Sequence, residues 1–437
     1  MDENKKSIAK EYLSYFVPCV LMAMATQLAS IVDKVFIGNF VNPLEMAAAN
    51  ACMPISQFVY TLSVLIGVGG SAAISVAKGR KNSADCNKIF GASIIWGLIF
   101  GAAFFLVLLA FPDFFLNFLL EDKSVQNLAK SYYLIFIFAV PLRLVSSIVQ
   151  NISRADGIPR LGSVAVIVSN LCNIVFNWIF MGPLGMGVRG AAFGTLICFA
   201  VECLINLSYL LFKKRTFLLQ FKGALSKTAE IFSVGLPACI GTGLITFKLV
   251  ILNNLSLNLS GSSGLVAMAI SISCLSLASM FSAGANNAMV PLAGKYFGAN
   301  DKKNLNLTKR ISFGLLMLFT TVVVVFLEIF AGIFARFHGV SDPETLKICT
   351  ESIRIYAMSL YGMSFTFYMI YFLPIIGKKS VSTAMSLCEG FIFIIPLCFL
   401  FSKLWGLNGI WLAFIATEIL TAILYFILKN LKNPFRK

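Results

Sequence analysis

The sequence predicts an all-α polytopic membrane protein with twelve transmembrane helices in two six-helix, pseudo-symmetric lobes around a central cavity. Hydrophobic residues make up 58% and charged residues 12% of the 437 residues, and the mean hydropathy is +0.86. Soluble proteins average about 45–50% apolar and about 25% charged residues. The composition therefore excludes a large soluble catalytic domain, a receptor ectodomain and a DNA-binding module.

Twelve apolar stretches follow one another along the chain, each bounded by charged residues or by Gly, Pro and Asn. A membrane helix needs roughly 20 apolar residues, and each stretch is long enough. Because backbone groups in lipid must be satisfied internally, we expect each stretch to be a helix. The expected spans are 13–37, 46–76, 89–111, 130–152, 161–182, 190–212, 231–255, 264–293, 311–334, 349–375, 381–402 and 409–428.

An internal repeat relates the two halves. A single shift of almost half the chain length superposes Pro18 on Pro237, Ala48 on Ala267 and Gly79 on Gly298, and a marginally larger shift brings Gly157 onto Gly377. Six spans per half make the repeats parallel, and such halves usually enclose a substrate path. We therefore expect an amino-terminal lobe, 1–220, and a carboxy-terminal lobe, 221–437.

The net charge of +16 is explained by topology. Lys and Arg gather at the termini and in alternate loops: Lys5 to Lys10, Lys78 to Lys88, Arg154 and Arg160, Lys213 to Lys227, Lys295 to Arg310, Lys378 and Lys379, and Lys429 to Lys437. The positive-inside rule then places both termini in the cytoplasm. Nucleic acid is not needed as a partner to explain this charge.

Catalytic and metal centres find little support in the sequence. The only histidine, His338, lies in an expected outer loop, and the 11 cysteines form no CxxC pair. This argues against a His-based triad, a His-rich metal centre and a disulfide framework. We expect no enzyme, no catalytic residue and no cofactor.

Ionisable residues inside membrane spans are costly and indicate function by default. Asp33 lies five residues before Gly38, Asn177 lies five before Gly182, and Thr195 lies five after Gly190. All three would lie about 7–8 Å below the outer helix ends at roughly 1.5 Å per residue. Asn173 lies one turn deeper than Asn177 on the same helix face.

Together these side chains predict a coupling site for a hard cation such as Na⁺, or for a proton carried on Asp33. The alternative is a carboxylate that is hydrogen-bonded within the packing or paired with Lys34.

Five further ionisable residues could line the cavity or bind substrate: Glu202, Glu418, Glu389, Lys248 and Arg143. Glu202 and Glu418 lie in the corresponding sixth and twelfth spans, one helical turn out of register. Each acid could instead reach a polar neighbour between packed helices. Arg143 could bond backbone carbonyls loosened by Pro141. Lys248 could be neutral through burial, or an acid could hold it charged.

Several motifs resemble the multidrug and toxic compound extrusion (MATE) family, most closely its DinF/MepA-like bacterial branch. They occur in order over essentially the whole chain: Val32-Asp33-Lys34-Val35-Phe36-Ile37-Gly38, Ala47-Ala48-Ala49-Asn50, Met53-Pro54-Ile55, Gly67-Val68-Gly69-Gly70-Ser71, Arg154-Ala155-Asp156-Gly157-Ile158-Pro159-Arg160 and Gly187-Val188-Arg189-Gly190-Ala191-Ala192-Phe193-Gly194-Thr195.

The resemblance implies export of organic cations and drugs against an inward flow of Na⁺ or H⁺. It also implies a cation site in the amino-terminal lobe, which falls on Asp33, Asn173, Asn177 and Thr195. Many relatives carry Asp where this chain has Asn177, so a site with one carboxylate should bind Na⁺ less strongly or use a proton. The acidic site that the NorM-like branch has in its carboxy-terminal lobe is not expected, since span seven carries Lys248.

From these arguments we expect a monomeric antiporter in the bacterial inner membrane, which exports small amphipathic, cationic compounds and contacts membrane lipid. Two other functions stay open. A flippase for a lipid-linked oligosaccharide or cell-wall precursor would need cations for pyrophosphate, and Arg143, Lys248 and Lys34 keep that option. A membrane-embedded enzyme would need a convergent catalytic set.

Overall fold

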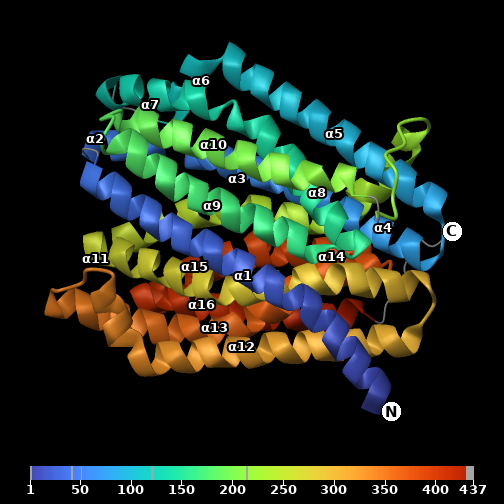
Figure 1. The fold of residues 1–437 in the computed structure, drawn as a ribbon. Coiled ribbons are helices and arrows are strands. Elements are labelled where there is room, and N and C mark those ends of the chain that lie inside the picture. Colours follow the sequence, from blue (N-terminus) through green and yellow to red (C-terminus); the bar gives the residue numbers. More distant parts are fainter. Residues whose placement is uncertain (1, 41–42, 51, 120–122, 213–214, 430–437) are drawn as a thin grey trace. The chain divides into compact units, whose positions relative to one another are not determined.

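The structure, a computed structural model, describes residues 2–40, 43–50, 52–119, 123–212 and 215–429. The side chains of 2–3, 33–39, 43–44, 46–47, 119 and 124 lie outside the described part. The described residues form helices joined by short turns (Figure 1). The longer elements are α1 (Asp2–Phe40), α2 (Pro43–Asn50), α3 (Met53–Ser63), η1 (Val64–Val68), α4 (Gly69–Gly79), α5 (Ser83–Ala110), α6 (Pro112–Leu119), α7 (Lys123–Phe136), α8 (Ala139–Asp156), α9 (Pro159–Met181), α10 (Gly187–Leu207), α11 (Thr228–Gly298), α12 (Lys302–Phe337), α13 (Pro343–Ile375), α14 (Lys379–Leu387), η4 (Cys388–Ile392), α15 (Ile394–Trp405) and α16 (Leu407–Leu428).

The described helices confirm the all-α membrane fold. Ten of them are long and apolar enough to cross a membrane, and α7 with α8 forms an eleventh span bent by 45°. The long helix α11 is broken at Ser260 and Gly261, where the backbone leaves helical geometry. Counting its two halves separately gives twelve spans in the described chain, and they coincide with the twelve expected stretches.

The chain divides into two compact units. Unit 2 comprises residues 17–235 and 294–301, and unit 1 comprises 1–16, 236–293 and 302–437. The expected lobes, 1–220 and 221–437, stay a prediction.

In unit 2, α8 packs against α5, α9 and α10, and α9 packs along α10 (Figure 1). In unit 1, α13 packs between α12 and α16, and α15 packs against α16. Each unit has its own core, with Phe90, Tyr133 and Ile148 buried in unit 2 and Tyr356 and Trp411 buried in unit 1.

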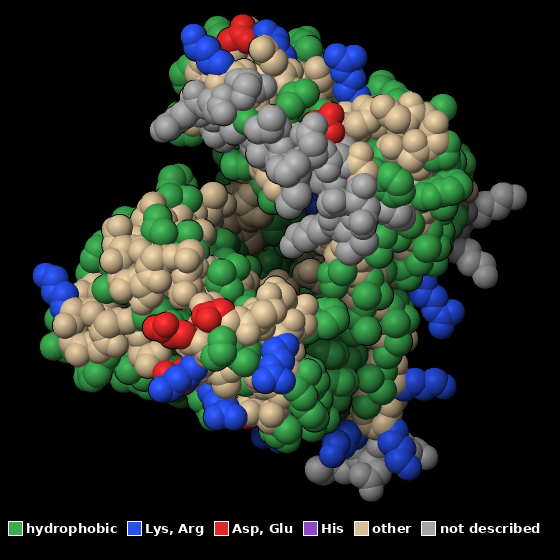
Figure 2. Space-filling view, turned by 90° about the vertical axis from the view of Figure 1, so that its left-hand side faces the viewer, with side chains coloured by type: hydrophobic (Ala, Val, Ile, Leu, Met, Phe, Trp, Pro, Cys, Tyr) green, Lys and Arg blue, Asp and Glu red, His purple; other side chains and the backbone are tan. Residues whose placement is uncertain are grey.

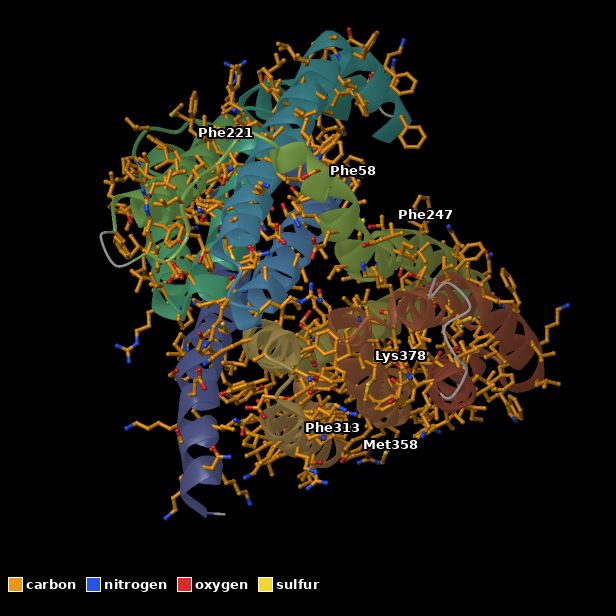
Figure 3. All side chains as sticks on the ribbon, turned by 90° about the vertical axis from the view of Figure 1, so that its right-hand side faces the viewer. Phe58, Phe221, Phe247, Phe313, Met358 and Lys378 are labelled. Carbon is orange, nitrogen blue, oxygen red and sulfur yellow. The ribbon has the colours of Figure 1, made fainter. Side chains whose placement is uncertain are left out.

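Hydrophobic side chains also cover the outside of the helices, as expected where the solvent is lipid. Figure 2 shows them over large parts of one face, with charged side chains in separate patches. Phe58 in unit 2 and Phe247 and Met358 in unit 1 are examples of exposed apolar side chains (Figure 3). Single exposed residues are ordinary, but so many on long apolar helices indicate a multi-pass membrane protein.

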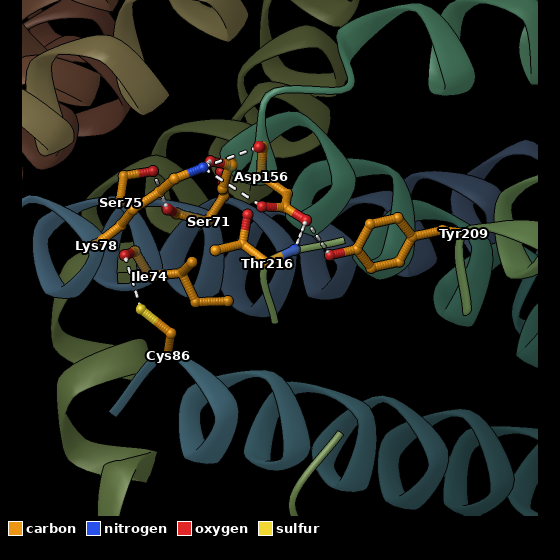
Figure 4. A network of polar contacts seen from close by, with 9 residues as sticks. Ser71, Ile74, Ser75, Lys78, Cys86, Asp156, Tyr209 and Thr216 are labelled. Atoms are coloured by element: carbon orange, nitrogen blue, oxygen red, sulfur yellow. Dashed lines mark hydrogen bonds and ion pairs between the residues drawn. The ribbon is translucent and has the colours of Figure 1, made fainter. Parts of the chain in front are cut away.

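One end of unit 2 is fastened by Asp156 (Figure 4). The buried Asp156 carboxylate accepts hydrogen bonds from the Tyr209 hydroxyl and the Thr216 backbone N–H, both at 2.8 Å, and lies 3.3 Å from Lys78 Nζ. These contacts join α4, α8 and the segment that follows α10. The sequence pattern places the motif around Arg154 in a loop, but α8 continues to Asp156 and buries both side chains. The contacts of Asp156 with Lys78, Tyr209 and Thr216 compensate for the burial of its charge at the end of this longer helix.

Candidate functional site

The predicted polar layer of unit 2 begins with two asparagines one turn apart on α9. Asn177 Nδ2 donates a hydrogen bond of 3.2 Å to Asn173 Oδ1. The two side chains are 2% and 5% exposed. Burying an amide in an apolar span costs free energy unless the amide has hydrogen-bond partners. The pair therefore favours further polar groups or an ion beside it inside unit 2.

Helix α10 approaches this pair through a glycine. A methyl group on Gly194 would lie 1.8 Å from Asn177 Oδ1, far closer than two such atoms can come. The next residue is Thr195, which is half-buried and donates a hydrogen bond of 2.9 Å to the Ala191 carbonyl of its own helix. The absent side chain at Gly194 therefore lets α10 pack closely against Asn177, while the place of Thr195 in the layer stays a prediction.

The side chains of Asp33 and Lys34 lie outside the described residues, so the role of Asp33, and its possible pairing with Lys34, stay predictions. The course of α1 is consistent with the depth expected for Asp33. A methyl group on Gly182, just after α9, would lie 3.5 Å from Phe40 Cε1, so the two helices end side by side. Asp33 lies seven residues before Phe40, about 10 Å along the helix, whereas Asn177 and Asn173 lie about 7–8 Å and about 13–14 Å before Gly182.

A second buried cluster of unit 2 surrounds Glu202 on α10. The hydroxyl of Ser146 on α8 donates a 3.1 Å hydrogen bond to Glu202 Oε1 and accepts one of 2.9 Å from Asn206 Nδ2. Arg143 interacts electrostatically with Glu202, and its guanidinium lies 4.5 Å from the centroid of the Phe199 ring. The structure thus brings two predicted residues together. The bonding of Arg143 to backbone carbonyls stays a prediction.

In unit 1, Lys248 and Glu389 form a buried ion pair. Lys248 Nζ on α11 lies 2.5 Å from Glu389 Oε1, and their side chains are 7% and 2% exposed. Glu389 lies in η4, a π-helical turn, and such turns occur frequently at functional sites. The structure thus places an acid directly against Lys248, as one of the two expectations for this residue requires.

Glu418 on α16 is also buried in unit 1. The hydroxyl of Thr366 on α13 donates a 2.6 Å hydrogen bond to Glu418 Oε2. A methyl group on Gly362 would lie 2.3 Å from Glu418 Cβ, so the carboxylate-bearing residue packs directly on the α13 backbone. The structure does not test whether Glu202, Glu389 or Glu418 contacts a substrate.

Ser146 and Thr366, whose hydroxyl groups donate to Glu202 and Glu418, were not among the predicted residues. Thr366 is related to Ser146 by the same shift along the sequence that relates Gly377 to Gly157. Each half therefore places a hydroxyl of its fourth span against a glutamate of its sixth. The repeat contained this signal, because corresponding positions in the two halves carry the same kind of side chain.

Comparison with known proteins identifies the fold. The family model MatE matches residues 18–179 and 237–400. The chain is 25% identical over 434 residues to the multidrug export protein MepA of Staphylococcus haemolyticus, covering 98% of this chain and 95% of that protein. It is 24% identical to MepA of Staphylococcus aureus, with 96% and 93% covered.

Solved structures share the architecture. An outward-facing multidrug resistance MATE family transporter of the MOP superfamily superposes with a TM-score of 0.89 at 20% identity, covering 96% of this chain and 94% of that one. A mutant of the Vibrio cholerae MATE transporter VcmN gives 0.89 at 21% identity, with 99% of each chain covered. Since the family model matches well over half of its residues, this chain belongs to the MatE family.

Proposed function

We propose that this protein is a secondary active antiporter, which exports amphipathic, cationic organic compounds in exchange for H⁺ or Na⁺. The observation that carries the proposal is the buried polar pair in unit 2, in which Asn177 packs against Gly194 and donates a hydrogen bond to Asn173, close to the depth expected for Asp33 along α1. The names of the relatives, multidrug export proteins, support export as the activity.

The chemistry of the layer fits a coupling ion. Asp33 would supply one carboxylate, and Asn173, Asn177 and Thr195 would supply neutral oxygens of the kind that hard cations prefer. With a single carboxylate the layer can equally hold a proton on Asp33. Binding of either ion would change the packing of α1 against α9 and bias the protein between outward- and inward-facing states.

Membrane placement follows from the charges. The turn after α4, the end of α8 and the segment after α10 carry basic residues and meet at one end of unit 2 through Asp156. In unit 1, Lys378 after α13 donates a hydrogen bond to the carbonyl of Lys429 after α16. We propose that these basic ends face the cytoplasm of a bacterial cell, with both termini inside and the protein acting as a monomer.

A lipid-linked precursor flippase is the second candidate, since it would need free cations for pyrophosphate. Lys248 is paired with Glu389, and Arg143 is stacked on Phe199 beside Glu202. Both cations therefore have partners within their own unit, which favours the antiporter. The relatives are named multidrug export proteins, which supports a transporter over an enzyme. The proposed activity requires no cofactor.

The test is efflux of a fluorescent organic cation from proteoliposomes, driven separately by a pH gradient and by a Na⁺ gradient. We expect transport to follow one gradient and to be lost in Asp33→Asn. The matched control is Asp113→Asn, an acid-to-amide change at an exposed ion pair with Lys130, which should transport like wild type.

Gradient-driven export by a folded Asp33→Asn protein at the wild-type rate would refute the coupling role. If folded wild type transports under neither gradient, the antiporter proposal fails, and assays of lipid-linked precursors should replace it.

A further inference from the structure

Three charged side chains lie together inside unit 1: Lys248 on α11, Glu389 on η4 and Glu418 on α16. Each is at most 6% exposed as a residue. Lys248 Nζ contacts Glu389 and also lies 5.8 Å from the centroid of the Phe414 ring, one turn before Glu418 on α16. Glu389 and Lys248 both interact electrostatically with Glu418. The three groups form one cluster.

The charges of this cluster do not cancel. Lys248 neutralises the carboxylate of Glu389, and no Lys or Arg among the described residues forms an ion pair with Glu418. The hydrogen bond to Glu418 comes from Thr366, which is neutral. The other titratable groups nearby are Tyr356, Cys274 and Cys398, and none of these side chains can carry a positive charge.

With both carboxyl groups ionised, the cluster would have a net charge of −1 inside an apolar unit. An uncompensated buried charge is strongly unfavourable, so one positive charge must enter the cluster. The corresponding cluster of unit 2 has no such excess of acids, because it holds one carboxyl group, that of Glu202, and one cation, Arg143, which interacts with it electrostatically. The two hydroxyl–glutamate pairs are alike in geometry and differ in charge balance.

We propose that Glu418 is a proton-binding site of unit 1, distinct from the layer around Asp33. The carboxyl group binds one proton while Lys248 stays on Glu389, and releases it to water when a positive charge approaches Glu418. That charge is an organic ammonium, which takes the place of the proton; a move of Lys248 to Glu418 would instead pass the proton to Glu389. The π-helical turn at Glu389 gives the ion pair room to rearrange, since the turn is wider than an α-helical one.

The use of this proton in transport depends on the proposed antiporter function, whereas its binding to Glu418 does not. Infrared spectroscopy of the purified protein in H₂O and D₂O counts protonated carboxyl groups without any transport. We expect Glu418→Gln to lose one buried carboxylic-acid band, and Glu230→Gln, the control at a solvent-accessible ion pair with Lys227, to keep the wild-type bands.

Lys248→Met provides an independent variant if Glu418→Gln does not fold. Removing the cation should leave Glu389 with a proton as well, so this variant should gain one carboxylic-acid band. The double variant Lys248→Met/Glu389→Gln should return to the wild-type number.

The inference is overturned if Glu418→Gln keeps every wild-type band, or if Lys248→Met gains none. Wild-type protein that shows the Glu418 band but transports under neither gradient would refute the antiporter proposal alone. Antiport without this band would refute the Glu418 site alone.

Discussion

Replacing Gly194 with alanine tests the geometry of the polar layer directly. The new Cβ would start 1.8 Å from Asn177 Oδ1 and 2.9 Å from Asn177 Cγ. Ordinary van der Waals contact begins at 3.4 Å, so the oxygen must recede by roughly the length of a carbon–carbon bond, or α10 must retreat from α9. Either movement separates Asn177 from the layer that we propose holds the coupling ion.

The magnitude has two parts. Overpacking a well-filled site costs about 1–3 kcal/mol, and the better helix propensity of alanine returns about 1 kcal/mol, so we expect a net loss of stability of about 0–2 kcal/mol. Loss of one oxygen partner from a charged group costs about 1.5–3 kcal/mol. The ion concentration for half-maximal transport should therefore rise by about ten- to a hundredfold.

The assay measures that ion concentration in proteoliposomes, together with thermal unfolding in detergent. Gly314→Ala is the matched control, because a methyl group there would meet nothing within 4 Å. The double variant Gly194→Ala/Asn177→Ala should regain stability without regaining ion affinity. If Gly194→Ala has the ion dependence of wild type, Asn177 is not part of the coupling site.

Two further predictions concern the ends of the helices. Asp156→Ala removes the acceptor of Tyr209 and of the Thr216 N–H, and should destabilise the protein by about 1–3 kcal/mol in thermal unfolding; Asp113→Ala at its exposed pair should not. At the start of α13, a hydrogen bond from a backbone N–H holds the pKa of Asp342 below its usual 3.8. The ionised form of Asp342 therefore stabilises the folded state above that pH, and this contribution is lost as the pH falls through the lowered pKa. In Asp342→Ala, thermal stability should lack this part of its pH dependence. A variant with the same pH dependence of stability as wild type would contradict the capping role.

The membrane fold could be predicted because lipid leaves few choices. Apolar stretches of sufficient length must be helices, and even the break of α11 at Gly261 falls between two expected spans. The end of α8 could not be predicted in the same way. A charged residue such as Asp156 indicates a loop unless its partners are known, and the partners Tyr209 and Thr216 lie 53 and 60 positions further along the chain.

The candidate site could be predicted only in part, because the sequence gives positions along a helix but not contacts between helices. Depth along a helix follows from spacing, so Asn173 and Asn177 could be placed from the sequence. Which side chain faces a buried charge depends on how helices are packed. The pairing of Lys248 with Glu389 joins residues 141 positions apart, and serine and threonine are too common for Ser146 or Thr366 to be noticed alone.

The two hydroxyl–glutamate pairs constrain how the halves can differ in function. A hydrogen bond from a hydroxyl favours the carboxylate over the acid, but both pairs have one, so this bond does not distinguish the two halves. The balance of charges distinguishes them: Arg143 interacts with the single acid Glu202, whereas Lys248 is already bound to a second acid, Glu389. One additional acid, Glu389, is therefore enough to leave unit 1 in need of a positive charge while the cluster of unit 2 is balanced. A duplicated scaffold can in this way keep its packing in both halves while only one of them exchanges a proton at this position.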